Sequence, residues 1–467
     1  MQRTWNIDTV EHIDETVRLN GWVHSIRKMG DKLVFVDLRD ASGLVQIVFY
    51  KPDLDDETAE LVNSIRPEFV LEIEGVVQER GKKQVNEDLP TGTVEVGAKS
   101  LKVLNKAGTP PFELDQDAID VAEKTRLKYR YLDLRTERMQ KNIRLRSDWV
   151  QACREYLFGE KFVEIETPLL TKATPEGSRD FVVPSRLQQG KFFALPQSPQ
   201  QYKQLLMTAG FERYFQIARA LRDEDLRADR GFEHSQVDIE MSFADRDEIM
   251  DMVERMVIYA AEKLGFTIKE KPFPRISHKD ALKKHGDDKF DLRTKEEKAA
   301  GVLAYAWVID FPFFEKDEKS GNWTFTHNPF SDPLPEHKED LLAGKNVENI
   351  LTTQYDLVCN GYESGGGSVR AHQAEVLEAT YKIMGYSEDE IQESIGHMLE
   401  AFRFGTPPHG GIALGVERNL MNLTGETALR EVVAFPMTSS GNTSAMDAPT
   451  ELSKETLDEL HIQTKHD

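Results

Sequence analysis

Residues 219–243 read RALRDEDLRADRGFEHSQVDIEMSF and join a dense run of charges to the alternating pattern of a β-strand. The stretch before it, RYFQIARALRDE at 213–224, alternates as well. The turn-rich DLRADRGFE between them predicts an antiparallel hairpin with a long loop. In the second strand the expected apolar face is Val237, Ile239, Met241 and Phe243, and the expected polar face is Gln236, Asp238, Glu240 and Ser242. Exposure to solvent would explain such a polar face, so the rest of the chain must decide its purpose.

Three further stretches combine glycine or polar residues with an apolar segment, namely YDLVCNGYESGGGSVR at 355–370, GTPPHGGIALGVERNLM at 405–421 and ALPQSPQQYKQLLM at 194–207. Glycine lets a ligand approach the backbone closely, and planar guanidinium groups such as those of Arg222 and Arg418 suit phosphate oxygens. Asp356 and Glu363 could hold Mg²⁺, which favours a few carboxylates plus substrate phosphates. Each feature also has an ordinary structural explanation, a flexible turn for GGGS and a salt bridge for an arginine after a strand.

Composition limits the classes of function. The 467 residues include 59 Lys and Arg against 81 Asp and Glu, a net charge of −22, so contact with nucleic acid must depend on local basic surface. Two cysteines without a Cys-x-x-Cys pair argue against structural zinc and a disulfide framework. The chain shows neither a signal peptide nor an apolar run long enough to span a membrane, which predicts a cytoplasmic protein with no membrane partner.

The first hundred residues predict a small β-barrel. Five short segments are rich in Val, Ile and Phe and are separated by Gly, Asn and Asp: 17–27, 32–40, 43–50, 68–79 and 93–104. A helix is expected at 52–66, between the third and fourth strands. This order is typical of an OB-fold, a common binder of single-stranded nucleic acid.

One face of this barrel carries a candidate base-binding aromatic residue. Alternation in KLVFVDLRD places Phe35 on the face opposite Val34, Val36 and Leu38. An aromatic ring among charges could stack on a base, or it could fill one end of the barrel. Gln46 on the next strand, with Arg27 upstream, favours binding.

A basic connector follows a Pro-containing linker. Residues 124–146 contain nine Lys or Arg against Asp133 and Glu137, which could form a phosphate-binding surface or a solvated helix face. The apolar spacing in 142–159 predicts an amphipathic helix leading into FVEIETPLL, where Pro168 after a strand favours a sheet edge or an interface.

Taken together, these motifs resemble those of bacterial-type aspartyl-tRNA synthetases of class II over nearly the whole chain. FVEIETPLL, ALRDEDLRADR with QVDIEMSF, and GGIALGVER resemble the three motifs of the class, and TPEGSRDF, LPQSPQQYKQLL, NGYESGGGSVR and GTPPHGG resemble the aspartyl group. The resemblance implies an α+β multidomain chain. It would comprise a five-stranded OB-fold anticodon-binding domain at 1–108, a hinge at 109–135, and a class II catalytic domain at 136–467 built on an antiparallel sheet flanked by helices.

The resemblance also implies roles for individual residues. Arg222 and Arg418 would be catalytic. The aspartate site would comprise Glu176, Gln200, Lys203, Arg222, Gln236, Asp238, His327 and Arg370. The ATP site would comprise Arg222, Asp223, Glu224, Glu363, Gly415, Val416, Glu417 and Arg418, with Asp356 and Glu363 binding Mg²⁺. Arg27, Phe35 and Gln46 would read the tRNA anticodon.

The implied reaction activates L-aspartate with ATP and transfers the aspartyl group to the 3′-terminal adenosine of tRNA(Asp), with a homodimer as the working unit. Three alternatives stay open. The enzyme could also charge tRNA(Asn), it could be an asparaginyl- or lysyl-type synthetase, or it could be a non-catalytic RNA-binding descendant. Retention of Arg222, Glu363 and Arg418 argues against the last, while Lys203 and Arg370 favour aspartate.

The chain departs from the family pattern at several points. An insertion domain of about a hundred residues is usual between the second and third motifs, whereas this chain predicts only a short excursion near 285–303. Gly231 and Phe232 replace a common Gln-Pro pair, Asn328 replaces a histidine, and Glu417 replaces an aspartate. Thr93 stands at a position often acidic near the anticodon site.

Overall fold

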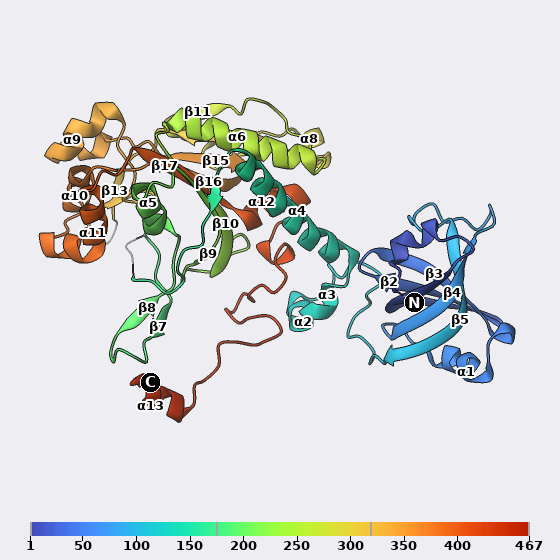
Figure 1. Cartoon of the computed structure of the whole chain (residues 1–467). Coiled ribbons are helices and arrows are strands. Elements are labelled where there is room, and N and C mark those ends of the chain that lie inside the picture. Colours follow the sequence, from blue (N-terminus) through green and yellow to red (C-terminus); the bar gives the residue numbers. More distant parts are fainter. Residues whose placement is uncertain (1, 174–175, 318–319, 466–467) are drawn as a thin grey trace. The chain divides into compact units, whose positions relative to one another are not determined.

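A computed structural model describes residues 2–173, 176–317 and 320–465. The chain divides into two compact units, Met1–Arg138 and Met139–Asp467, each described by itself below (Figure 1). Residues 109–135 group with the first unit. Within the described residues, no helix has the length and apolar character needed to cross a membrane.

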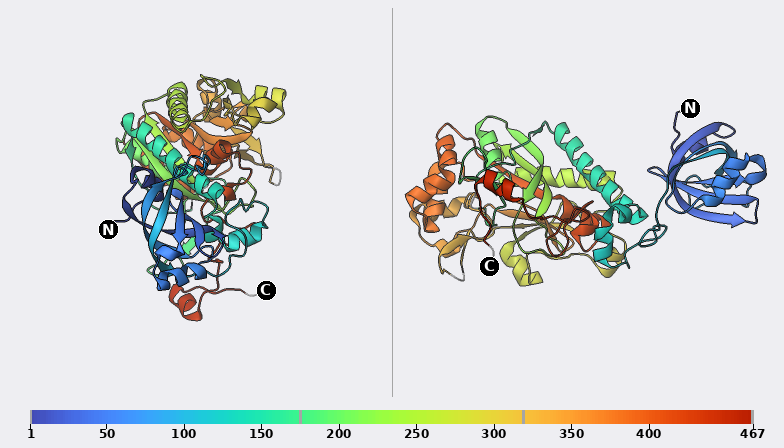
Figure 2. Two further views of the ribbon diagram at one scale, coloured as in Figure 1. Left: turned by 90° about the vertical axis from the view of Figure 1, so that its right-hand side faces the viewer. Right: turned by 90° about the horizontal axis from the view of Figure 1, so that it is seen from below.

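The first unit contains the predicted five-stranded barrel. Its strands are β1 (Thr16–Met29), β2 (Leu33–Asp40), β3 (Gly43–Tyr50), β4 (Val70–Glu79) and β5 (Val94–Asn105), and they close in the order β1-β2-β3-β5-β4. Figure 2 shows these blue strands curved into a barrel. Inward side chains alternate with outward ones, and Val34, Val36 and Leu38 are fully buried as expected. Helix α1 (Asp56–Ser64) lies between β3 and β4, and the Asp55 carboxylate caps it by accepting the Thr58 backbone N–H.

The basic connector forms α2 (Glu123–Lys128), α3 (Arg130–Asp133) and the start of α4 (Glu137–Gly159). Arg126 and Arg130 are buried and both contact the Asp133 carboxylate, at 3.4 Å and 2.5 Å. These two arginines therefore stabilise the connector and are not part of a phosphate-binding surface.

The second unit is built on an eight-stranded, mostly antiparallel sheet in the order β11-β12-β15-β16-β17-β10-β9-β6. The strands, in chain order, are β6 (Val163–Glu164), β9 (Arg213–Leu221), β10 (Glu233–Ser242), β11 (Arg275–Ser277), β12 (Tyr305–Ile309), β15 (Tyr355–Cys359), β16 (Tyr362–Val369) and β17 (His409–Gly415). The strand before Pro168 is thus at the sheet edge, as predicted.

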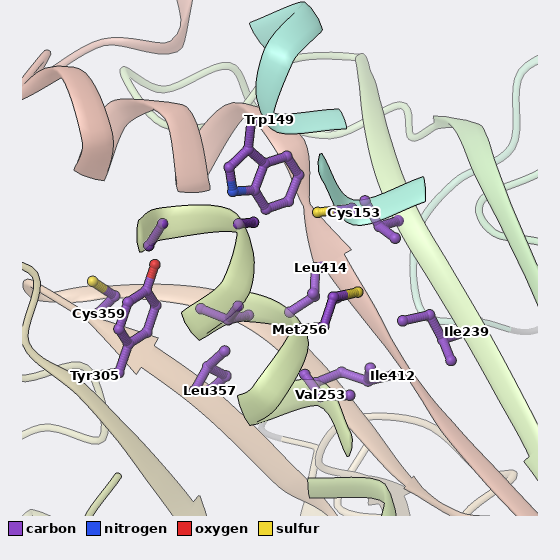
Figure 3. Packing of buried hydrophobic residues seen from close by; sticks show 14 of the residues in the cluster. Trp149, Cys153, Ile239, Val253, Met256, Tyr305, Leu357, Cys359, Ile412 and Leu414 are labelled. Carbon is purple, nitrogen blue, oxygen red and sulfur yellow. The ribbon is translucent and has the colours of Figure 1, made fainter. Parts of the chain in front are cut away.

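One face of this sheet packs against α4, α6 (Arg246–Lys263) and α12 (Val416–Thr424). Their shared core includes Trp149 and Cys153 of α4, Met256 of α6, and Ile239 and Ile412 of the sheet (Figure 3). Apolar strand residues fill this side of the sheet, so the alternate residues must lie on the opposite side.

The predicted hairpin is formed by β9 and β10, paired antiparallel with Gln236 opposite Ala218 and Asp238 opposite Gln216. Val237, Ile239 and Met241 are buried in the core as expected. The prediction for Phe243 is wrong, because Phe243 lies beyond the strand end, has a positive φ of 57°, and is exposed. Asp238 and Glu240 are fully buried, which excludes solvent exposure as the reason for the polar face.

The opposite side of the sheet carries α5 (Gln200–Thr208), which packs against β9 and β10. Beside it lies a cluster of α9 (Lys338–Ala343), α10 (Ala374–Ile383) and α11 (Glu388–Phe402) with a common apolar core (Figure 1). Apart from short 3-10 helices, the other described elements are the two-stranded sheets β7 (Val182–Pro184) with β8 (Phe192–Ala194) and β13 (Phe314–Lys316) with β14 (Trp323–Phe325), and the helices α7 (His278–His285), α8 (Lys295–Ala299) and α13 (Lys454–Leu460). Residues 286–303, which include α8, form the short excursion expected between the second and third motifs.

Candidate active site

Four buried charged side chains meet between α5 and the polar face of β10. Lys203 Nζ lies 2.7 Å from Asp238 Oδ1 and 3.2 Å from Glu240 Oε2. Arg370, at the end of β16, donates from Nε to Glu240 Oε1 at 3.0 Å and from Nη1 to Ser368 Oγ at 2.9 Å. The strands hold these groups in register because Asp238 and Glu240 are two residues apart on one strand.

The two acids of this cluster differ in their electrostatics. Burial raises the pKa of Asp238 despite the Lys203 ammonium, and Asp238 Oδ2 accepts no hydrogen bond within the described part of the chain. Burial also opposes ionisation of Glu240, but the charges of Arg370 and Lys203 outweigh it and lower the pKa. Asp238 therefore keeps one buried carboxylate oxygen without a donor among the described residues, whereas Glu240 contacts both Lys203 and Arg370.

Glu240 had no role in the sequence-based prediction. Strand alternation already placed it on the polar face beside Asp238, so the pattern could have identified it. What the pattern could not show was which helix covers that face.

Two other residues predicted to bind aspartate lie on the same elements as this cluster, Gln200 on α5 and Gln236 on β10. Gln200 is buried and donates to Gln204 Oε1 at 3.0 Å. Gln236 is also buried, and no group in the described residues (2–173, 176–317 and 320–465) donates a hydrogen bond to its Oε1. Glu176 accepts from Ser198 Oγ at 2.6 Å. Thr174 and Pro175, the first residues of the motif that contains Glu176, lie outside the described residues.

His327 belongs to a second polar group. Its Nε2 lies 3.3 Å from Asp356 Oδ2, and the Gln354 amide donates to Asp356 Oδ1 at 2.8 Å. Burial alone would lower the pKa of His327, but the adjacent Asp356 carboxylate outweighs burial and raises it. Asn328, the replacement for a second histidine, caps a local turn through the Phe330 backbone N–H at 3.0 Å.

Arg418, in the first turn of α12, contacts two carboxylates. Its Nη1 lies 3.4 Å from Glu363 Oε2, and its Nη2 lies 3.2 Å from Asp229 Oδ2 in the hairpin loop. Burial opposes ionisation of Glu363, yet the positive charges led by Arg418 lower its pKa. The hairpin loop and α12 therefore meet over β16.

Gly366, the middle glycine of GGGS, lies inside β16 and not in a flexible turn. A Cβ atom there would be 2.9 Å from Asp356 Oδ1 and 3.5 Å from Glu363 Oε1. The two carboxylates thus converge over a position where any side chain would force the Asp356 carboxylate to shift.

The two converging carboxylates of Asp356 and Glu363 can be compared with the ligands that Mg²⁺ needs. The residues that the structure describes include no group of three His, Cys, Asp or Glu side chains arranged to hold a metal. Two converging carboxylates fit an ion that takes its remaining ligands from water and substrate phosphates, as Mg²⁺ usually does.

Three more residues predicted to bind ATP lie at the start of the hairpin loop. Arg222 follows β9 and donates from Nε to the Gln197 carbonyl at 3.4 Å. Asp223 Oδ2 lies 3.5 Å from Arg179, and Glu224 accepts from Ser178 and from Arg230 at 2.7 Å. Phe232, one of the two departures in this loop, packs edge-on against Phe181.

At the start of α12, Gly415 is the N-cap residue and Val416 is buried. Both Glu417 oxygens accept the Ser235 backbone N–H, at 3.0 and 3.2 Å, and Oε1 also pairs with Arg146 of α4 at 2.9 Å. The Glu417 carboxylate thus joins α12 to β10 and α4, whereas its neighbour Arg418 turns toward Glu363.

His234 is a further residue that the sequence-based prediction missed. It lies on β10 two residues before Gln236, whose amide N–H donates to His234 Nε2 at 3.2 Å. Burial, with the nearby charges of Arg222, Arg418 and Arg219, lowers its pKa to about 3. The imidazole is therefore neutral and lies beside the predicted phosphate-binding arginines.

On the barrel, the three predicted anticodon residues lie on one surface. Arg27 pairs with Phe35 in the β1–β2 register, with its guanidinium 5.9 Å from the ring centroid. Arg27 Nη2 donates to Gln46 Oε1 at 3.0 Å, and Gln46 donates to Glu95 at 3.0 Å. An aromatic ring beside a guanidinium and an amide is a suitable surface for an unpaired base.

Comparison with known proteins agrees with this architecture. Residues 122–439 match the family described as tRNA synthetases class II (D, K and N), and residues 17–104 match the OB-fold nucleic acid binding domain. Among curated relatives, the aspartate–tRNA(Asp/Asn) ligase of Anoxybacillus flavithermus is 39% identical over 97% of this chain and 96% of its own length. The aspartate–tRNA ligase of Staphylococcus saprophyticus is 36% identical over 97% of both chains.

Solved structures share the fold. The asparaginyl-tRNA synthetase of Pyrococcus horikoshii in complex with asparaginyl-adenylate has a TM-score of 0.75 at 24% identity, over 94% of this chain and 98% of that one. A putative aspartyl-tRNA synthetase from Leishmania major has a TM-score of 0.73 at 23% identity, over 92% of both chains. At these identities the likeness concerns the fold alone.

The comparison also bears on the missing insertion. The alignment with the Anoxybacillus relative runs over 580 positions, whereas this chain has 467 residues, so that relative carries more than a hundred residues that this chain lacks. Family motifs, fold and site geometry lead to the same conclusion. The chain belongs to the class II tRNA synthetases of the D, K and N type.

Proposed function

We propose that this chain is an aspartate–tRNA ligase that acts on tRNA(Asp). The observation that carries the choice of amino acid is the buried cluster of Lys203, Asp238, Glu240 and Arg370. Its two cations suit a side-chain carboxylate, and its free acidic oxygen suits an ammonium group. The aspartate–tRNA ligase names of relatives at 36–39% identity support the same function.

Charge balance explains how the cluster would select aspartate. In the free enzyme, Lys203 and Arg370 are neutralised by Asp238 and Glu240. The substrate ammonium would pair with Asp238, with Gln236, Gln200 and Glu176 nearby, and Lys203 and Arg370 would then pair with the substrate's side-chain carboxylate. Asparagine would leave a buried cation without a partner, and such mismatches cost on the order of 10⁴-fold in synthetase pockets.

The activation step needs no protein nucleophile. One oxygen of the aspartate α-carboxylate attacks the α-phosphorus of ATP and forms a new P–O bond. The bond between the α-phosphorus and the bridging oxygen breaks, and pyrophosphate leaves with the electron pair. Arg222 and Arg418 would stabilise the negative charge on the phosphates, with Asp223, Glu224 and the start of α12 holding ATP. His327 would orient the substrate through its pair with Asp356.

Mg²⁺ would be held by Asp356 and Glu363 together with substrate phosphates. When bound, such an ion neutralises phosphate charge and orients the polyphosphate. In the second step, a hydroxyl of the terminal adenosine of tRNA attacks the aspartyl carbonyl and releases AMP. Arg27, Phe35 and Gln46 would bind the anticodon of the same tRNA.

We further propose a cytoplasmic homodimer. Both cysteines are free and buried, which suits a reducing compartment. The edge strand β6 carries an exposed Val163, with Phe158 and Leu169 exposed on either side of it in the chain. Apolar residues at an unpaired sheet edge favour contact with a second copy, which sedimentation would detect.

A second candidate, charging of tRNA(Asn) as well as tRNA(Asp), is favoured by the similarity to the Anoxybacillus aspartate–tRNA(Asp/Asn) ligase. Aminoacylation of purified tRNA(Asn) with aspartate distinguishes the two candidates. A barrel that reads only tRNA(Asp) would leave tRNA(Asn) uncharged.

The central experiment is amino-acid-dependent exchange of pyrophosphate into ATP, with aspartate, asparagine and lysine compared. We expect exchange with aspartate alone, and its loss in Arg418→Ala and Arg370→Met. Arg186→Met, which removes an exposed arginine paired with Glu459, should exchange like the wild type. Exchange with asparagine in preference to aspartate would refute the assigned roles of Lys203 and Arg370. Absence of exchange with any amino acid would support the non-catalytic alternative.

A further inference from the structure

The short excursion between the second and third motifs reaches the phosphate end of the candidate site. Helix α7 ends at Gly286, whose φ of +78° lets the chain turn sharply. The next residues lead to Lys289, whose Nζ lies 3.6 Å from Glu363 Oε2. Lys289 was not among the residues predicted to bind substrate.

The backbone on either side of Lys289 is well anchored. The Phe290 side chain is buried and stacks on His285, and its carbonyl accepts the Gly361 backbone N–H at 3.1 Å. Asp291 contacts Arg293 at 2.9 Å and Lys298 at 3.0 Å. These contacts therefore fix the backbone next to Lys289, while its long side chain can still move between different partners.

That partner is already shared. The same Glu363 oxygen that Lys289 approaches also accepts from Arg418 Nη1 at 3.4 Å. Arg418 is also one of the two arginines proposed to bind the phosphates of ATP. Arg418 also pairs with Asp229 at 3.2 Å, so Lys289 and Arg418 are balanced by two carboxylates over long contacts, and a polyphosphate with its higher charge would compete with these acids for both cations.

A purely structural role explains Lys289 poorly. Its side chain is 44% exposed and its separation from Glu363 is long for a strong ion pair. Pairs of this kind contribute little to stability, and the buried Phe290 already holds the segment in place. A lysine at the rim, with a flexible stem and a compact charge, is typical of phosphate binding.

We propose that Lys289 is a phosphate ligand of this site, binding the polyphosphate of ATP and the pyrophosphate that it releases. This inference rests on the proposed function, because it uses the same ATP site. It gives the excursion at 286–303 a direct part in substrate binding. Loss of Lys289 should weaken binding of both polyphosphates and leave the affinity for aspartate unchanged.

The test compares Lys289→Met with Lys298→Met, which removes a lysine of similar exposure that pairs with Asp291 in the same excursion. Binding of ATP with Mg²⁺, and of inorganic pyrophosphate, is measured by calorimetry without amino acid. We expect Lys289→Met to raise both dissociation constants roughly tenfold, as for loss of one charged contact. Lys298→Met should bind like the wild type, and Lys289→Arg should recover most of the affinity.

In the exchange assay, Lys289→Met should raise KM for ATP and for pyrophosphate but not KM for aspartate, a split that general damage to the fold would not produce. Unchanged binding in Lys289→Met, or equal weakening in Lys298→Met, would overturn the proposal. A wild type that binds ATP but shows no aspartate-dependent exchange would refute the proposed function while the binding comparison still tests Lys289. A wild type that binds neither polyphosphate would overturn both.

Discussion

Lys203 Nζ lies 2.7 Å from Asp238 Oδ1, and both side chains are almost completely buried. The same ammonium is 3.2 Å from Glu240, so one cation faces two anions, and Arg370 supplies the second cation. Buried charges are tolerated only when they are paired. The candidate aspartate pocket therefore contains two cations and two anions that balance each other. Aspartate would bring one ammonium and two carboxylates, so its binding would change which of these charges pair with one another.

Removal of Lys203 should destabilise the fold as well as abolish aspartate-dependent exchange. Lys203→Met leaves Asp238 and Glu240 buried side by side with only Arg370 to neutralise them. We expect the free energy of unfolding, measured with urea, to fall by roughly 3 kcal/mol, as when one partner of a buried pair is removed. Adding Asp238→Asn to Lys203→Met should recover part of the loss.

Lys382→Met is the matched control, because Lys382 forms an exposed pair with Glu378 one helical turn away. Its effect should stay below about 0.5 kcal/mol. If Lys203→Met and Asp238→Asn have simply additive effects, the two side chains do not interact as described.

His234 predicts a specific pH dependence of stability. Its pKa falls to about 3 in the folded protein because the half-buried imidazole is desolvated and lies near the charges of Arg222, Arg418 and Arg219. The unfolded chain has the ordinary value of about 6.5. Above pH 6.5 the imidazole is neutral in both states, and stability does not change with pH through His234. The folded state loses stability as the pH falls from about 6.5 toward 3, because unfolding then takes up a proton.

His234→Gln removes this contribution. The free energy of unfolding of the wild type, measured at pH 7, 6 and 5, should fall more steeply than that of the variant, by up to about 1.4 kcal/mol for each pH unit. Parallel curves for the two proteins would show that His234 is not held neutral.

Much of this site follows from strand alternation. The pattern of 236–242 placed Gln236, Asp238 and Glu240 on one face, and β10 has that arrangement. The alternation in β2 likewise placed Phe35 outside the barrel. Period-two patterns are reliable where one face of a sheet is buried, because a shift by one residue would expose the whole core face.

Other features depend on contacts between distant segments and could not be predicted from the sequence. The buried pairing of Arg130 with Asp133 turned part of an apparently basic surface into core. Glu417 pairs with Arg146 of α4, far away in the chain. Phe243 continues the apolar alternation in sequence, but the strand ends at Ser242 and the backbone turns.

Phe35 should affect tRNA binding without affecting amino-acid activation. Stacking of one base on an aromatic ring contributes about 1–3 kcal/mol. Phe35→Leu keeps an apolar side chain but removes the ring, so KM for tRNA in aminoacylation should rise roughly tenfold while exchange of pyrophosphate stays at the wild-type rate. Trp5→Leu is the control, because Trp5 is an exposed aromatic residue that, like Phe35, lies beside an arginine of the barrel unit. Equal effects of the two changes would argue against base stacking on Phe35.

Gly366→Ala tests whether the converging carboxylates of Asp356 and Glu363 matter for the reaction. The new methyl group would lie 2.9 Å from Asp356 Oδ1, closer than real contacts allow, so the Asp356 side chain must move away from His327 and Gln354. Misplacement of catalytic groups by about 1 Å can cost on the order of a hundredfold in rate. We therefore expect the rate of aspartate-dependent exchange to fall at least tenfold and its Mg²⁺ requirement to rise.

Gly159→Ala adds a methyl group in open space at the end of α4 and should leave exchange unchanged. Exchange at the wild-type rate in Gly366→Ala would mean that the position of Asp356 does not affect catalysis. That result would refute the proposed magnesium site at Asp356 and Glu363.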